Sequence, residues 1–155
     1  MKNRRTVYIL ALGLICFASF STPAQRPGKS EPSLAREPVS TVRTTPAYAE
    51  VILRRTELEA ELESLLIGFT EEYPKIKSSR YTIAQLQKQV AALLAVKPAE
   101  ASKLSLALGK LMVRKVELDT DLWDLQQNLA DGHPDVQRAK RKVEIFEKAI
   151  KEILG

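Results

Sequence analysis

Large apolar side chains recur from residue 46 onward at alternating steps of three and four positions. In the longest run these positions are Leu104, Leu108, Leu111, Lys115, Leu118, Leu122, Leu125 and Leu129. This spacing places apolar residues on one stripe of an α-helix, which is the pattern of coiled-coil heptads. Four runs of this kind predict four helices, which cover residues 46–71, 74–96, 99–130 and 134–154.

Prolines and a glycine mark where these helices begin and end. Thr45 is the expected N-cap of the first helix, and Pro74 and Pro134 begin the second and fourth, because proline suits the first helical turn. Gly132 is expected to cap the end of the third helix, since a left-handed residue there needs no Cβ. The connections at Pro74 and Pro134 are so short that they predict antiparallel neighbours.

The second half of this region repeats the first half at a spacing of 60 residues. Eight of the 41 residue pairs from Arg54/Arg114 to Leu94/Leu154 are identical, and most other apolar positions keep an apolar side chain. A repeat of this length with helical spacing indicates a duplicated helical hairpin. We therefore predict an all-α fold of two tandem antiparallel coiled-coil hairpins, arranged as a four-helix bundle or as a rod.

The domain organisation that follows has four parts. Residues 1–24 form a predicted signal peptide, residues 25–45 a disordered linker, residues 46–96 the first hairpin and residues 97–155 the second. The linker is rich in proline, serine and threonine and holds few large apolar side chains, so it cannot offset its ordering entropy.

The signal peptide is predicted from three basic residues that precede an apolar run from Val7 to Phe20. The run of about 14 residues is shorter than the roughly 20 of a membrane-spanning helix, which favours cleavage over an uncleaved N-terminal anchor. We therefore expect export across the inner membrane, to the periplasm or outside the cell. Cys16 is the only cysteine, and cleavage would leave the mature chain without a thiol.

The charge balance argues against nucleic acid as a partner. The whole chain has a net charge of +5, but residues 46–155 hold 17 basic and 17 acidic side chains. A nucleic-acid-binding surface needs an excess of basic residues to neutralise phosphates. The predicted helices lack this excess.

Three side chains are candidates for register or interaction. Arg55 and Lys115 occupy the same stripe position in the two repeats. A polar residue there fixes helix register at a cost in stability, and the alternative is contact with an anionic polymer. Trp123 lies one residue past Leu122, off the apolar stripe. It either packs between the two hairpins or is exposed as an anchor for a partner.

The second turn contains Asp131, Gly132, His133, Pro134 and Asp135. One imidazole and two carboxylates are too few ligands for a closed metal site, and the first repeat has different residues there. We therefore expect no metal and no other cofactor. The sequence also contains none of the common nucleophile, phosphate-loop or metalloprotease motifs, so we expect no catalytic residues and no enzyme.

The second turn also carries a family resemblance. Residues 131–136, Asp-Gly-His-Pro-Asp-Val, lie between a leucine heptad and a basic helix that contains Val143, Phe146 and Ile150. The chain here resembles the helical arm of the polysaccharide co-polymerase (chain-length determinant) family, whose periplasmic coiled coil turns at a His-Pro-Asp or Tyr-Pro element. The resemblance covers residues 50–154. The transmembrane helices and α/β base of that family are not matched by this sequence.

The resemblance implies an isolated arm that accompanies exopolysaccharide export. We therefore expect a structural or scaffolding protein of the cell envelope. Its expected partner is an envelope protein or a component of polysaccharide export, and a homo-oligomer is a further alternative. Two other classes stay open. A periplasmic helical chaperone or stress adaptor needs an exposed apolar concave face, and an anion or metal sensor needs ligand residues gathered on one surface.

Overall fold

The computed structural model describes residues 38–155, with side chains from residue 41 onward. Its helices, in chain order, are α1 (Pro38–Arg43), α2 (Pro46–Gly68), α3 (Pro74–Leu94), the 3₁₀-helix η1 (Pro98–Lys103), α4 (Leu106–Gln126) and α5 (Pro134–Leu154). This part of the chain contains no β-strand, and the predicted all-α class is confirmed. The predicted signal peptide and most of the predicted linker lie outside the described residues.

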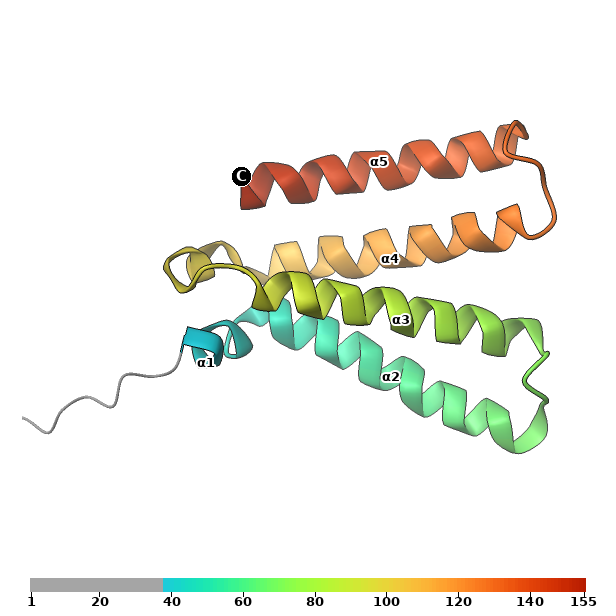
Figure 1. Cartoon of the computed structure of the whole chain (residues 1–155), viewed down its shortest axis with the longest axis horizontal. Coiled ribbons are helices and arrows are strands. Elements are labelled where there is room, and N and C mark those ends of the chain that lie inside the picture. Colours follow the sequence, from blue (N-terminus) through green and yellow to red (C-terminus); the bar gives the residue numbers. More distant parts are fainter. Residues whose placement is uncertain (1–37) are drawn as a thin grey trace, which may run out of the picture. The chain divides into compact units, whose positions relative to one another are not determined.

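The four long helices form two antiparallel pairs (Figure 1). α2 packs on α3, α4 packs on α5, and the two members of each pair run in opposite directions. α4 also packs along both α2 and α3, so the two pairs lie side by side. Among the described helices, α5 makes its main contacts with α4.

Side-chain caps explain where α2 and α4 begin. The Thr45 hydroxyl accepts a hydrogen bond from the backbone N–H of Tyr48 at 3.4 Å, which confirms Thr45 as the N-cap of α2. The Ser105 hydroxyl accepts one from the N–H of Leu108 at 3.3 Å in the same way. Each cap satisfies one of the backbone donors that a helix start leaves without a partner.

The predicted third helix, residues 99–130, is wrong at its start. Residues 98–103 form η1, and α4 begins only after Ser105. Leu104, which the heptad pattern assigned to the helix, lies between the two elements and is buried. Its carbonyl accepts a hydrogen bond from the Ala47 N–H at 3.2 Å, which ties the start of α2 to the start of α4.

The predicted cap at the end of the third helix is also wrong. α4 ends at Gln126, and the backbone of Gly132 does not adopt a left-handed conformation. The N–H groups of Asn128 and Leu129 instead donate to the Leu125 carbonyl at 3.1 and 2.9 Å. These bonds close the helix end before Gly132 is reached, so glycine is not needed as a cap.

The last part of the predicted linker, residues 25–45, is folded. Residues 38–43 form α1, which contacts η1 and α3, and Val42 is only 1% exposed. α1 and η1 begin 60 residues apart, as do α2 and α4, and α3 and α5. The duplicated unit therefore includes a short helical turn ahead of each helix pair.

The core lies mainly in the part of the helices remote from the two turns. Its main cluster consists of Val42, Ala47, Val51, Leu58, Leu86, Leu93, Leu104, Leu108, Met112, Val116 and Ile150. Ile76 and Val136, beside the two turns, are fully buried as well. α2 and α4 approach closely at Gly109, where a Cβ atom would lie 2.9 Å from the Ala47 Cα. Nearer the turns, four stripe leucines are only half-buried, namely Leu62, Leu65, Leu122 and Leu125.

Candidate interaction surfaces

Trp123 lies at the contact between the two helix pairs. Its ring stacks on that of Tyr81 from α3, with ring centroids 4.8 Å apart and planes inclined by 13°. Burial in this contact raises the pKa of Tyr81, and the nearby charge of Asp119 adds to the rise. Trp123 is partly buried here, so its indole ring contributes to packing between the pairs.

Two polar contacts continue the line between α3 and α4. The hydroxyls of Thr82 and Thr120 share a buried hydrogen bond of 2.8 Å, and the Ser78 hydroxyl donates to the Asp124 carboxylate at 2.7 Å. These four residues were not predicted as a site. They lie off the apolar stripes, and threonine or serine in a helix gives no sign in the sequence of which neighbour it meets.

Arg55 and Lys115 each pair with a carboxylate on their own helix. The Arg55 Nε atom lies 3.2 Å from the Glu59 carboxylate, and the Lys115 Nζ atom lies 2.8 Å from the Asp119 carboxylate. Both pairs have the same spacing of four residues, and both basic side chains are half-buried. Such pairs stabilise a single helix, and an anionic polymer would have to compete with these carboxylates. The predicted role in helix register stays a prediction.

The candidate residues of the second turn serve local structure. The His133 Nδ1 atom accepts a hydrogen bond from the Asp135 N–H at 3.2 Å and so caps α5. Hydrogen bonds from Gln126 and Lys140, both 3.0 Å long, lower the pKa of Asp131. Within residues 41–155, no three histidine, cysteine, aspartate or glutamate side chains lie close enough together to hold a metal ion.

Pro134 and Gly132 complete that turn. Pro134 begins α5 as Pro74 begins α3, which matches the predicted helix starts. Gly132 is exposed, and a Cβ atom built on it meets nothing within 4 Å. The turn therefore leaves room for a larger residue at this position.

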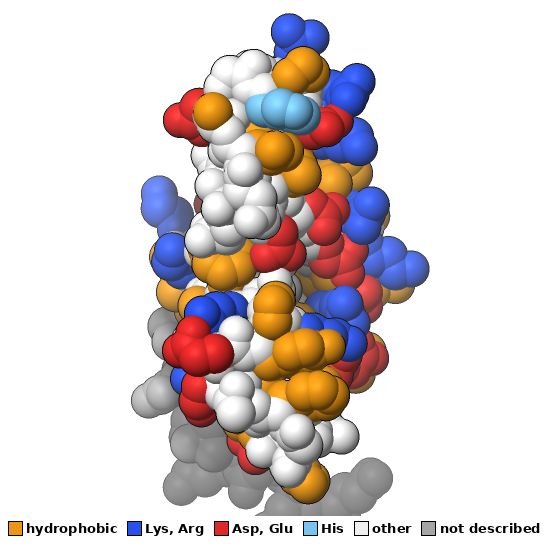
Figure 2. Space-filling model, turned by 90° about the vertical axis from the view of Figure 1, so that its right-hand side faces the viewer, with side chains coloured by type: hydrophobic (Ala, Val, Ile, Leu, Met, Phe, Trp, Pro, Cys, Tyr) orange, Lys and Arg blue, Asp and Glu red, His pale blue; other side chains and the backbone are white. Residues whose placement is uncertain are grey.

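The first turn presents apolar side chains to solvent. The rings of Phe69 and Tyr73 stack with centroids 4.3 Å apart, and both are exposed. Ile67, at the end of α2, is 90% exposed. Figure 2 looks onto the turn end of the molecule, where apolar side chains lie among acidic and basic ones. We call Ile67, Phe69 and Tyr73 the tip cluster.

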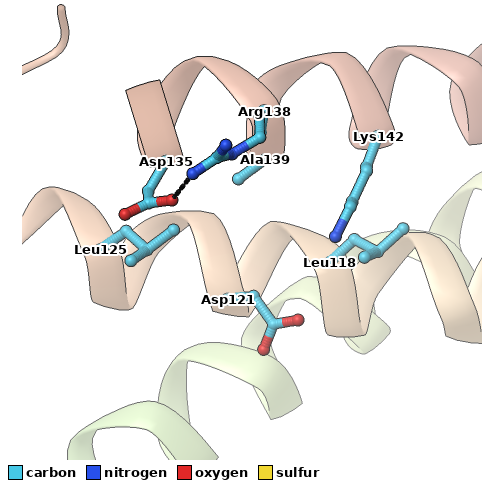
Figure 3. A pocket seen from close by; sticks show the side chains of 7 residues that line it. All are labelled: Leu118, Asp121, Leu125, Asp135, Arg138, Ala139 and Lys142. Atoms are coloured by element: carbon cyan, nitrogen blue, oxygen red, sulfur yellow. Dashed lines mark hydrogen bonds and ion pairs between the residues drawn. The ribbon is translucent and has the colours of Figure 1, made fainter. Parts of the chain in front are cut away.

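An open groove runs between α4 and α5 (Figure 3). It is lined by Leu118, Asp121 and Leu125 from α4 and by Asp135, Arg138, Ala139 and Lys142 from α5. The Asp135 carboxylate accepts a hydrogen bond from Arg138, and this bond lowers the pKa of Asp135. Leucine side chains with charged groups beside them match the mixed polarity of an amphipathic helix, which is a common occupant of such grooves.

No helix in the described part of the chain is long and apolar enough to cross a membrane. No protein-family model, curated protein or solved structure matches the chain. The surfaces described above are therefore the basis for its proposed function.

Proposed function

We propose that the protein is a non-enzymatic scaffold of the cell envelope that accompanies exopolysaccharide export. In this proposal the two helix pairs are tandem antiparallel coiled-coil hairpins. The observation that carries it is the tip cluster, because three large apolar side chains exposed beside one turn are costly unless a partner covers them.

The distribution of the other side chains supports a role through contact. Most large apolar residues pack between helices, and Arg55 and Lys115 are engaged by carboxylates of their own helices. The predicted signal peptide supports an envelope location, and the resemblance of residues 131–136 to a polysaccharide co-polymerase arm supports the link to polysaccharide.

A scaffold accounts for the exposed apolar side chains better than a helical chaperone does. Outside the tip cluster, the large exposed apolar residues are Leu53 on α2, Leu106 on α4 and Ile145 on α5. They are dispersed over three helices of the described region, whereas a chaperone needs a continuous apolar face for unfolded clients. The tip cluster lies within residues 67–73 beside one turn, as expected for one defined partner.

The proposal is tested by deleting the gene and measuring the amount and chain length of surface polysaccharide. We expect the deletion to change both, and the wild-type gene to restore them. A double variant of the tip cluster, Ile67→Ser with Phe69→Ser, should not restore them. Normal polysaccharide in the deletion strain would exclude the proposal.

Leu106→Ser is the matched control, because it removes an exposed leucine from α4, outside the tip cluster. It should restore the polysaccharide fully. Equal failure of the control and of the tip variant would show that the tip cluster has no special role.

A further inference from the structure

α4 docks in a groove of the first helix pair, and the equivalent groove of the second helix pair is open. α4 packs along both α2 and α3. Its position is fixed by an ion pair of 3.3 Å to α2 and by hydrogen bonds of 2.8 and 2.7 Å to α3, namely Arg54–Glu117, Thr82–Thr120 and Ser78–Asp124. The groove of the first repeat thus receives the first long helix of the second repeat.

The second repeat has the same groove between α4 and α5. In the first repeat, Ser79 on α3 is 5% exposed, and Thr82, one turn later, meets Thr120 of α4 and is 7% exposed. Their counterparts, 60 residues later, are Ala139 and Lys142, which line the open groove (Figure 3). Ala139 is half-buried and Lys142 is exposed. The same structural position is therefore covered in the first repeat and uncovered in the second.

α2 presents the face that fits this groove. The α4 positions that meet the first pair have counterparts on α2 at Ala49, Ala60 and Ser64, and all three side chains are exposed. They are small, as is Gly109 on α4, so another helix can approach closely. Leu53 lies on the same stripe and is 56% exposed. The outer face of α2 therefore has the spacing and side-chain sizes of a docking helix.

The charged residues of the α2–α4 contact are repeated as well. Arg54 and Glu57 on α2 recur as Arg114 and Glu117 on α4. Glu117 receives Arg54 within the chain, at 3.3 Å. Glu57 and Arg114, the counterparts of that ion pair, are both exposed. Within the chain, Glu57 pairs with Arg54 at 3.3 Å and Arg114 pairs with Glu117 at 2.8 Å. If α2 of one copy docked on α4 of another in this register, Glu57 of the first copy would also face Arg114 of the second.

The helices that carry the two surfaces also differ in net charge. α2 carries five acidic and two basic side chains, whereas α5 carries six basic and four acidic ones. In the register of the α3–α4 contact, Arg141 of α5 corresponds to Tyr81 and would face Glu63 of a second copy, which corresponds to Trp123. An ion pair would take the place of the aromatic stack.

We propose that a second copy of this chain places its α2 in the groove between α4 and α5, in the way that α4 lies between α2 and α3. The two surfaces in this contact are the outer face of α2, which we call the giving face, and the groove between α4 and α5, which we call the receiving groove. They are different surfaces, so the contact is heterologous. Copies would add head to tail, as repeats stack in solenoid proteins, unless the chain closes into a ring. This inference does not rest on the proposed function in the envelope.

A charge-swap experiment tests the proposal. Variant X reverses the giving face with Glu57→Lys and Glu63→Lys, and variant Y reverses the receiving groove with Arg114→Glu and Arg141→Glu. All four side chains are exposed, but Glu57 and Arg114 also pair within the chain with Arg54 and Glu117. Circular dichroism and urea unfolding therefore check that each variant keeps the fold. The protein is expressed from its full-length gene and purified from the producing cells. Its association is then followed by sedimentation velocity over a dilution series.

We expect the wild type to form assemblies of more than two copies that dissociate on dilution. They should be favoured at about 0.01 M salt, where the Debye length is about 30 Å, over about 1 M, where it is about 3 Å. X alone and Y alone should each associate roughly tenfold more weakly or worse, because attractive pairs become repulsive. An equimolar mixture of X and Y should assemble again, since each reversed face then meets its opposite.

The control variant carries Glu144→Lys and Glu147→Lys, which is the same change of charge as in X. Both positions are exposed on α5, and their counterparts on α3, Ala84 and Gln87, stay exposed in the first repeat although α4 docks there. It should assemble like the wild type. The proposal is overturned by a wild type that stays monomeric at every concentration or stops at two copies. It is also overturned if the mixture of X and Y fails to assemble.

Discussion

Replacing Gly109 by alanine tests how closely α2 and α4 approach. A Cβ atom at this position would lie 2.9 Å from the Cα atom of Ala47, 2.9 Å from the Cβ atom of Glu50 and 3.0 Å from the Ala47 carbonyl oxygen. Two of these three atoms belong to the backbone of α2, and no change of side-chain rotamer can move them away. The helices would have to separate to admit one methyl group.

Two opposing contributions set the magnitude of this effect. Alanine is favoured over glycine in a helix interior by about 1 kcal/mol. Overpacking of a close contact costs about 1–3 kcal/mol, and we expect the upper part of that range because the contact is to backbone. Gly109→Ala should therefore lower the free energy of unfolding by about 1–2 kcal/mol, although alanine is the better helix former.

The assay is urea unfolding followed by circular dichroism, with Gly68→Ala as the control. Gly68 is the last residue of α2, and a Cβ atom there meets nothing within 4 Å. Its replacement should leave stability unchanged or raise it by up to about 1 kcal/mol. If Gly109→Ala were stabilising by the same amount as the control, the close approach of α2 and α4 would be refuted.

Three further predictions concern packing, the polar contact and acid. Leu86→Ala should cost about 2–5 kcal/mol because Leu86 is fully buried, and Leu122→Ala clearly less because Leu122 is half-buried; equal losses in urea unfolding would contradict this. Thr82→Val and Thr120→Val should each cost about 1 kcal/mol, and the double variant less than their sum, since both partners are then removed; strict additivity would rule out the coupling. The pKa of Asp131 is lowered from its ordinary value of 3.8, so the stability that its charge contributes is present above pH 3.8 and is lost as the pH falls through the lowered pKa. Asp131→Asn should therefore flatten the pH dependence of the urea midpoint below about pH 4. An unchanged pH dependence would exclude this contribution.

Much of the helix placement was predictable because the signals are local. The cap at Thr45 and the prolines at Pro74 and Pro134 act within one helical turn, and α2, α3 and α5 begin at the predicted residues. The heptad spacing also identified most of the residues that pack between helices. At Leu104 the same pattern failed, because a buried position just before a helix continues the spacing without being helical.

The contacts between the helix pairs were not predictable from the sequence. The Thr82–Thr120 hydrogen bond joins residues that are polar and outside the stripes, so only the docking of α4 reveals that they meet. The folded end of the predicted linker was missed for a similar reason. Val39 and Val42 are the large apolar residues of a short segment of mostly polar ones, and the burial of Val42 depends on distant neighbours in η1 and α3.

Disulfide trapping of equivalent positions tests the repeated docking most directly. In a Cys16→Ser background, Thr82→Cys with Thr120→Cys should close a bond within one chain, because the two hydroxyls are 2.8 Å apart. The counterparts on the open surfaces are Ala60 and Lys142. Ala60→Cys with Lys142→Cys should give a ladder of dimers, trimers and longer products on a non-reducing gel, whereas Ala60→Cys alone should stop at dimers. If the first pair closes within the chain and the second gives no ladder, the second groove does not receive α2 of another copy, and head-to-tail docking is contradicted.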